Sequence, residues 1–204
     1  MSLETALSRI AHLQQTLAPS PVPVAQPAPG AFNAALAQAS GAPATAATAT
    51  ASAPGAGTPA GQAVLNLVRN EVGVAEQPPG SNDSPRIAQY RQATAGAPGP
   101  GPWCAYFVSW AARESGVPIG DSGQGYGLVD DVWAWGERSG KAIPAAGATP
   151  QPGDLIVWDE HIGVVESVGA DGSISTIEGN SSDRVNRRTY GSDGGGAIGY
   201  VRLG

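Results

Sequence analysis

Three short segments of the chain hold residue types that together could do nucleophilic chemistry. Cys104, the only cysteine, stands in the run Pro-Trp-Cys-Ala-Tyr-Phe-Val-Ser-Trp at 102–110. His161 opens the run His-Ile-Gly-Val-Val-Glu, and Glu178 and Asn180 close the run Ile-Glu-Gly-Asn. A thiol, an imidazole and a polar group that orients the imidazole are what a cysteine hydrolase needs. The sequence therefore predicts catalysis through a cysteine nucleophile.

Cys104 falls at the start of a predicted helix over 103–115, directly after a loop rich in Gly and Pro. A helix N-terminus favours negative charge, so it promotes the thiolate, and its N–H groups can stabilise an oxyanion. Phe107 and Val108 share a helix face with Cys104, which predicts that the thiol points inward.

His161 is the candidate base by elimination, because the other histidine, His12, precedes a long linker. It heads a predicted strand over 162–168 that can pair with the strand ending at Trp158. Further along, alternation places Glu178 on one face of a strand, and Gly179 permits a turn that brings Asn180 round. Glu178 is the first candidate to orient the imidazole and Asn180 the second.

The elements that must position these residues change character along the chain. Helical patterns come first, over 62–72, 85–92, 103–115 and 130–138. Runs rich in β-branched and aromatic residues follow at 155–158, 162–168, 173–177 and 197–203. Asp171-Gly172 is a hairpin signal between two of them. Helices followed by an antiparallel sheet predict an α+β domain.

Composition divides the chain into three parts. The apolar spacing of residues 1–17 predicts a short amphipathic helix. Residues 18–60 have no charged side chain and consist mostly of Ala, Pro, Thr, Gly and Ser, which predicts a disordered linker. Residues 61–204 remain as the catalytic domain, long enough for one compact core.

Bulk properties exclude several classes of function. The formal net charge of −6 and the absence of any Lys/Arg-rich run argue against binding to nucleic acid. No apolar run approaches the about 18 residues of a membrane span, so we expect no stable membrane insertion. Glu4 and Arg9 interrupt the N-terminal segment, so it does not read as a classical signal peptide.

The spacing and neighbours of these residues resemble the CHAP family of bacterial cell-wall amidases and peptidases, which depend on cysteine and histidine. The Trp-Cys-Ala-x-Phe-Val-x-Trp and Pro-Gly-Asp-Leu-Ile-Val runs carry the resemblance, which extends over about 62–203. It implies a papain-like cysteine peptidase fold, with N-terminal helices packed on a small antiparallel sheet. In that pattern Cys104 is the nucleophile, His161 the general base and acid, and Glu178 with Asn180 the polar support. Asp154, in the Pro-Gly-Asp run, is scaffold.

The resemblance implies a peptidoglycan hydrolase that cuts an amide bond through a cysteine thioester. We favour an N-acetylmuramoyl-L-alanine amidase, with a peptidoglycan endopeptidase as the alternative. A flagellar or secretion-associated adaptor with a hydrolase-fold module, or a phage-type lysis enzyme, are further alternatives. The substrate places the expected activity in the cell wall, periplasmic or extracellular, reached by non-Sec export or after lysis.

No cofactor or metal is expected. Some family members carry an Asp-rich calcium loop just before the cysteine, whereas residues 91–102 hold no carboxylate here. Asn82 and Asp83 are the nearest oxygen ligands, and calcium takes about six to eight.

Other residues are candidates for contact with substrate or with partners. Trp133 and Trp135, with Tyr126, are candidates for a sugar-binding groove, with core and rim packing as the alternative, and Trp103 is a further candidate for contact with substrate. Arg184, near Arg187 and Arg188, is a candidate for the carboxylates of a peptide stem. The helix at 2–17 and an apolar island at 32–39 resemble N-terminal segments of flagellum-associated cell-wall hydrolases, which makes that helix a candidate docking segment for a partner.

Overall fold

The computed structural model describes residues 55–204. The expected helix at 2–17, the apolar island at 32–39 and most of the linker lie outside this range and stay predictions, as does the three-part division of the chain. Within residues 55–204, no helix has both the length and the apolar character that crossing a membrane requires.

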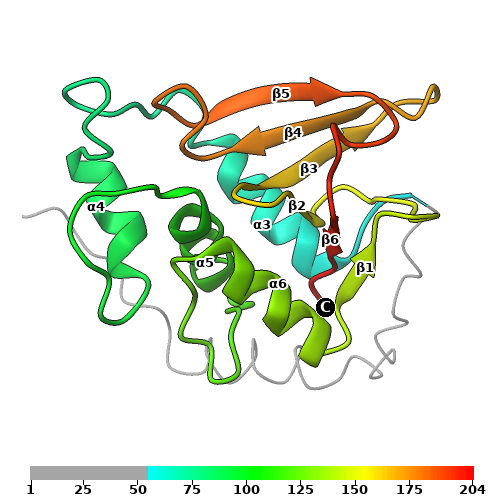
Figure 1. Ribbon diagram of the computed structural model, residues 1–204, viewed down its shortest axis with the longest axis horizontal. Coiled ribbons are helices and arrows are strands. Elements are labelled where there is room, and N and C mark those ends of the chain that lie inside the picture. Colours follow the sequence, from blue (N-terminus) through cyan, green and yellow to red (C-terminus); the bar gives the residue numbers. More distant parts are fainter. Residues whose placement is uncertain (1–54) are drawn as a thin grey trace, which may run out of the picture. The chain divides into compact units, whose positions relative to one another are not determined.

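The described part of the chain consists of helices followed by one antiparallel sheet, as the α+β prediction stated. The sheet has six strands in the order β1-β6-β2-β3-β4-β5, and every neighbouring pair is antiparallel. Figure 1 shows the helices gathered on one side of this sheet. The elements are α3 (Pro59–Arg69), α4 (Pro85–Gln92), α5 (Cys104–Glu114), α6 (Val129–Arg138), β1 (Ala142–Pro144), β2 (Leu155–Val157), β3 (Ile162–Val168), β4 (Ile174–Glu178), β5 (Asn186–Tyr190) and β6 (Gly199–Val201).

The helix predictions are confirmed for α4, α5 and α6, while the bounds predicted for the first helix were wrong. That helix runs over Pro59–Arg69 instead of 62–72. Thr58 caps it by accepting a hydrogen bond from the Gly61 N–H at 2.9 Å, and Pro59 occupies the first turn. Both are ordinary signals of a helix start.

Two strands were not predicted from the sequence. β5 is an edge strand with exposed Arg187, Arg188 and Thr189, so it lacks the apolar alternation that marks a strand buried on one face. β1 has three residues and forms the opposite edge. The predicted hairpin around Asp171-Gly172 is confirmed, since it joins the paired strands β3 and β4.

The core lies between the helices and the sheet, where α3 and α5 both contact the central strand β3. Four rings, Tyr90, Trp103, Phe107 and Trp110, pack together around α4 and α5 with centroids 4.8 to 6.3 Å apart. They fix α5 in place, and Cys104 is its first residue. A smaller apolar cluster includes Ile156, Val165, Ile174, Ala197 and Tyr200.

The Pro-Gly-Asp run ties the start of β2 to its neighbours. Gly153 adopts φ +92°, and a Cβ there would overlap the backbone of Gly61 in α3. Asp154 is buried, accepts the Gln151 N–H at 2.8 Å and pairs with Arg202 at 2.7 Å. These contacts agree with the expectation that Asp154 is structural.

We predict that Gly153→Ala lowers the free energy of unfolding by about 2–5 kcal/mol, the sum of the cost of a left-handed alanine and of overpacking. Gly140→Ala is the matched control, because Gly140 has φ +69° and nothing lies near its would-be Cβ. It should cost only the conformational part, about 1–2 kcal/mol. Urea denaturation of both variants measures the difference, and equal losses would contradict the close approach of Gly153 to α3.

Candidate active site

Cys104 is the first residue of α5 and is 5% exposed. The Phe107 N–H donates to the Trp103 carbonyl, which leaves the first N–H groups of the helix without intrahelical partners. No side chain of the described residues caps this N-terminus. The thiol therefore sits beside open N–H donors at the positive end of a helix dipole.

The end of β4 comes directly against this first turn of α5. A Cβ on Gly179 would lie 2.7 Å from Cβ of Phe107 and 2.8 Å from the ring of Trp103. Only a glycine fits here. Glu178, the last residue of β4, and Asn180, two residues beyond it, therefore lie at the level of Cys104.

His161 lies just before β3, and the Trp158 N–H donates to its carbonyl at 2.8 Å, as the predicted pairing of the two strands requires. Its Nε2 is 3.0 Å from a carboxylate oxygen of Glu178. Cys104 lies near enough to the same ring to help raise the pKa of His161. With Nε2 held by Glu178, Nδ1 is the nitrogen left to face Cys104. The structure thus brings Cys104, His161 and Glu178 together in a chain.

Glu178 is 1% exposed, and hydroxyl donors fix its other oxygen. Thr176 donates to that Oε1 at 2.5 Å and Tyr190 at 2.9 Å. Gly163 of β3 leaves the space for this side chain, since a Cβ there would lie 2.7 Å from Cγ of Glu178. The carboxylate is therefore held in one orientation, with Oε2 turned to the imidazole.

The electrostatics of this chain favour a charged imidazole. Burial lowers the pKa of His161, but the hydrogen bonds and charges of Cys104 and Glu178 outweigh it and raise that pKa to about 9. Burial also raises the pKa of Glu178, while His161, Thr176 and Tyr190 together bring it below its usual range. The pKa of Tyr190 rises to about 12 through burial and the adjoining Glu178 charge.

Asn180 lies on another side of the site and makes no hydrogen bond to His161 within the described structure. Its Oδ1 accepts the Trp103 N–H at 3.3 Å. Its Nδ2 donates to Glu76 at 3.1 Å and to Asn82 at 3.2 Å. Of the two sequence candidates, Glu178 contacts the imidazole and Asn180 contacts the segment that precedes Cys104.

Four of the candidate substrate contacts are scattered. Trp103 is fully buried in the aromatic cluster, so its ring is in the core and not at a substrate surface. Trp133 packs over Gly199 of β6, in line with the core or rim packing given as its alternative. Tyr126 is half-buried, with its hydroxyl 3.5 Å from Arg138, and Arg184 is exposed beside β5. None of the four lines the cleft at Cys104.

A cleft of about 370 Å³ opens beside the thiol. Leu128, which is 66% exposed, stands at the start of α6, and Asp159 and Glu160 belong to the turn before His161. The lining residues are Pro102, Cys104, Gly127, Leu128, Val129, Asp130, Asp159 and Glu160. Three carboxylates and no lysine or arginine are among them.

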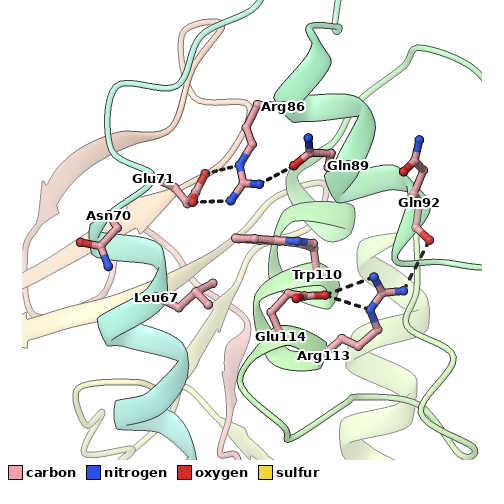
Figure 2. Close-up of a pocket in the computed structure, with 9 residues that line it drawn as sticks. All are labelled: Leu67, Asn70, Glu71, Arg86, Gln89, Gln92, Trp110, Arg113 and Glu114. Carbon is pink, nitrogen blue, oxygen red and sulfur yellow. Dashed lines mark hydrogen bonds and ion pairs between the residues drawn. The ribbon is translucent and has the colours of Figure 1, made fainter. Parts of the chain in front are cut away.

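A larger hollow of about 540 Å³ lies between α3, α4 and α5 and does not include Cys104 or His161. Figure 2 shows its charged groups satisfying one another: the Arg86 guanidinium lies between Glu71 and Gln89, and that of Arg113 joins Glu114 and Gln92. Its lining includes no cysteine, whereas the smaller cleft is lined by Cys104, so the smaller cleft is the candidate active site.

No group of three or more His, Cys, Asp and Glu side chains in residues 55–204 comes together as a metal site would require. The expectation of no metal remains a prediction.

A thiol at a helix N-terminus, with an imidazole and an orienting carboxylate nearby, is a set of groups that suits nucleophilic chemistry. Residues 96–180 match the model of the CHAP domain, the family that the sequence motifs resemble. Among solved structures the chain is similar to the peptidoglycan hydrolase RipB from Mycobacterium tuberculosis, with 19% identity and a TM-score of 0.42. The match covers 70% of this chain and 64% of that one, slightly less than two thirds. No curated protein matches the chain.

Sequence reasoning missed two residues of this region. Tyr190, which holds Glu178, lies on the unpredicted edge strand β5. Glu76, which holds Asn180, lies in a loop without periodicity. The distance of both from the motifs in sequence left no local signal.

We predict that the ring of His161 titrates near pH 9, as the pKa raised by Cys104 and Glu178 implies. Glu178→Gln removes the charge that favours the imidazolium, so the midpoint should fall toward the ordinary 6.5. Histidine ring NMR shifts measured against pH give both values, and a His12→Gln chain assigns the signal. A wild-type midpoint near 6.5, or an unchanged midpoint in Glu178→Gln, would contradict the contact.

Proposed function

We propose that this chain is a cysteine-dependent peptidoglycan hydrolase that cleaves an amide bond of the bacterial cell wall through a thioester. The observation that carries the proposal is the 3.0 Å contact of His161 with Glu178, beside the thiol that Cys104 presents at the start of α5. The raised pKa of His161, to which Cys104 and Glu178 both contribute, supports it. The CHAP match over 96–180 supports both the class of reaction and peptidoglycan as the substrate. The proposed place of action is therefore the cell wall.

In the first step the Cys104 thiolate attacks the amide carbonyl carbon, and the carbonyl oxygen takes up negative charge. The open N–H groups at the start of α5, that of Cys104 included, are suited to stabilise this oxyanion. Because the donors belong to the helix backbone, they need no reorganisation when the charge develops.

His161 then works as acid and as base. Its imidazolium gives the Nδ1 proton to the leaving amine as the C–N bond breaks and the thioester forms. The neutral ring next takes a proton from water, which attacks the thioester carbon and releases the acid and the thiolate. Glu178 keeps the ring oriented and stabilises its charged form in both steps, supported by Thr176 and Tyr190.

The bond we propose first is the amide between muramic acid and L-alanine, which rests on the resemblance. A peptide bond within the stem is the second candidate, and the cleft favours it. Asp130, Asp159 and Glu160 line the cleft without a lysine or arginine. Such a lining attracts an ammonium group, as on a diamino acid of the stem, and repels a stem carboxylate.

The experiment is digestion of purified peptidoglycan with the wild-type chain and with Cys104→Ala, followed by mass spectrometry of the fragments. We expect products from the wild type and none from Cys104→Ala, while His161→Gln should lose about 10²–10⁴-fold in rate because the acid and base is removed. Free L-alanine amines with intact muramic acid would identify the amidase, and new peptide termini the endopeptidase.

Two treatments serve as controls for this digestion. Alkylation with iodoacetamide should abolish activity, because Cys104 is the only thiol. EDTA should leave activity intact if no metal takes part. If peptidoglycan of several chemotypes yields no product that depends on Cys104, the proposed function is wrong. Loss of activity in EDTA would contradict the prediction of no metal.

A further inference from the structure

A buried carboxylate, Glu76, lies behind the nucleophile and has no part in the steps above. It is 3% exposed, and three N–H donors surround it. Oε1 accepts from Nε1 of Trp103 at 2.9 Å and from Nδ2 of Asn180 at 3.1 Å. Oε2 accepts the backbone N–H of Asn82 at 2.8 Å.

No lysine, arginine or histidine of residues 55–204 forms an ion pair with Glu76. A buried carboxylate without a counter-ion is costly and persists only when hydrogen bonds satisfy it. A glutamine is no substitute here. Its amide nitrogen would have to face one of the N–H donors, because N–H groups meet both carboxylate oxygens.

Two of these donors, Trp103 and Asn180, belong to the two segments whose relative position the proposed reaction depends on. Trp103 immediately precedes Cys104: Glu76 holds its ring, while Oδ1 of Asn180 holds its backbone N–H. Asn180 in turn follows Glu178 by two residues at the end of β4, and Glu178 holds His161. One carboxylate therefore joins the start of α5 to the strand that orients the imidazole.

The backbone around this carboxylate is also set by contacts. Asn180 and Asn82 both have positive φ, at 58° and 54°, a conformation that costs energy for a residue with a side chain. The backbone carbonyl of Asn82 accepts a hydrogen bond from the Arg91 guanidinium at 2.9 Å. The side-chain Oδ1 of Asn82 accepts from Nδ2 of Asn180. Both asparagines are thus held in uncommon conformations by bonds that converge on Glu76.

We propose that Glu76 is a positioning residue for the reaction: through Trp103 and Asn180 it fixes the first turn of α5 against the end of β4, and so sets the approach of the Cys104 thiol to His161. Asn180 acts through this linkage and not on the imidazole itself. The proposal rests on the proposed function, since it assigns Glu76 to the same site.

The first test needs no substrate. In the full chain, Glu76→Gln is compared with Glu114→Gln, an exposed glutamate on α5 that pairs with Arg113 outside the site. We expect Glu76→Gln to lower the His161 titration midpoint by about one pH unit, a tenfold change in the proton equilibrium, because the thiol moves away from the ring. Trp103→Phe removes a donor to Glu76 without changing any charge, so a lowered midpoint in that variant too shows that the lost charge is not the cause. Glu114→Gln should leave the midpoint in place.

The second test uses turnover of a soluble muropeptide. Glu76→Gln should lower kcat about 10–100-fold with KM nearly unchanged, as misplacement of reacting groups predicts. Asn180→Ala should lower kcat similarly, and the double variant should be no worse than the poorer single variant, because both act through one linkage. If the losses in kcat of the two single variants add in the double variant, Asn180 acts independently of Glu76, and the claim that it acts through this linkage is wrong.

A folded Glu76→Gln chain with an unchanged midpoint and kcat would overturn the proposal, since a merely structural carboxylate would alter only stability. If Glu76→Gln does not fold, Trp103→Phe is read in its place, because it removes one donor and keeps a ring. A lowered midpoint in a chain whose wild type cleaves no peptidoglycan would refute the proposed function and leave the linkage intact. If the wild type cleaves peptidoglycan but Glu76→Gln leaves both the His161 midpoint and kcat unchanged, the proposed function stands and the role of Glu76 is refuted.

Discussion

The contact between Gly179 and the first turn of α5 is the constraint on which the site depends. Gly179 has no side chain, so its backbone packs directly against the side chains of Phe107 and Trp103. This closeness places the carboxylate of Glu178, which holds the imidazole of His161, near the helix that carries the thiol. A side chain at residue 179 would force the two layers apart, and interiors packed at crystal density do not absorb such a change locally.

The rest of the fold keeps these two layers in place. The aromatic cluster around Tyr90 and Trp110 fixes α5 from the helix side, and the sheet fixes β4 between β3 and β5. Two buried carboxylates then set the fine geometry. Glu178 lies next to an ionisable partner and two hydroxyl donors, whereas Glu76 has N–H donors alone. A buried carboxylate is costly without its hydrogen-bond donors, so each of the two holds its donors in position.

Residues with local signals were predictable from the sequence. Ser84 and Pro85 indicate the start of α4, and the Asp171-Gly172 turn signal gives the pairing of β3 with β4. The Gly/Pro loop before Cys104 places the thiol at a helix start. Long-range geometry was not predictable. The split of Glu178 and Asn180 between two partners depends on the turn at Gly179. The burial of Trp103 depends on Glu76, which lies 27 residues before it.

The edge strands show a second reason for failure. β5 carries exposed arginines because its position at the edge of the sheet favours charge, so its sequence resembles a solvated loop. Tyr190 at its end was missed with it, although Tyr190 donates to the carboxylate that orients the imidazole. Tyr190 acts only through its contact with Glu178, so no sequence motif marks the strand that carries it.

The dependence of kcat/KM on pH, in wild type and in Glu178→Gln, tests the central claim most directly. His161 must carry a proton to release the leaving amine, so activity should fall as pH rises through about 9, the value to which Cys104 and Glu178 raise its pKa. Removal of the Glu178 charge lowers that pKa, so the basic limb should move to lower pH in the variant. Basic limbs that coincide in the two proteins would contradict the account, because Glu178 would then not set the protonation of His161.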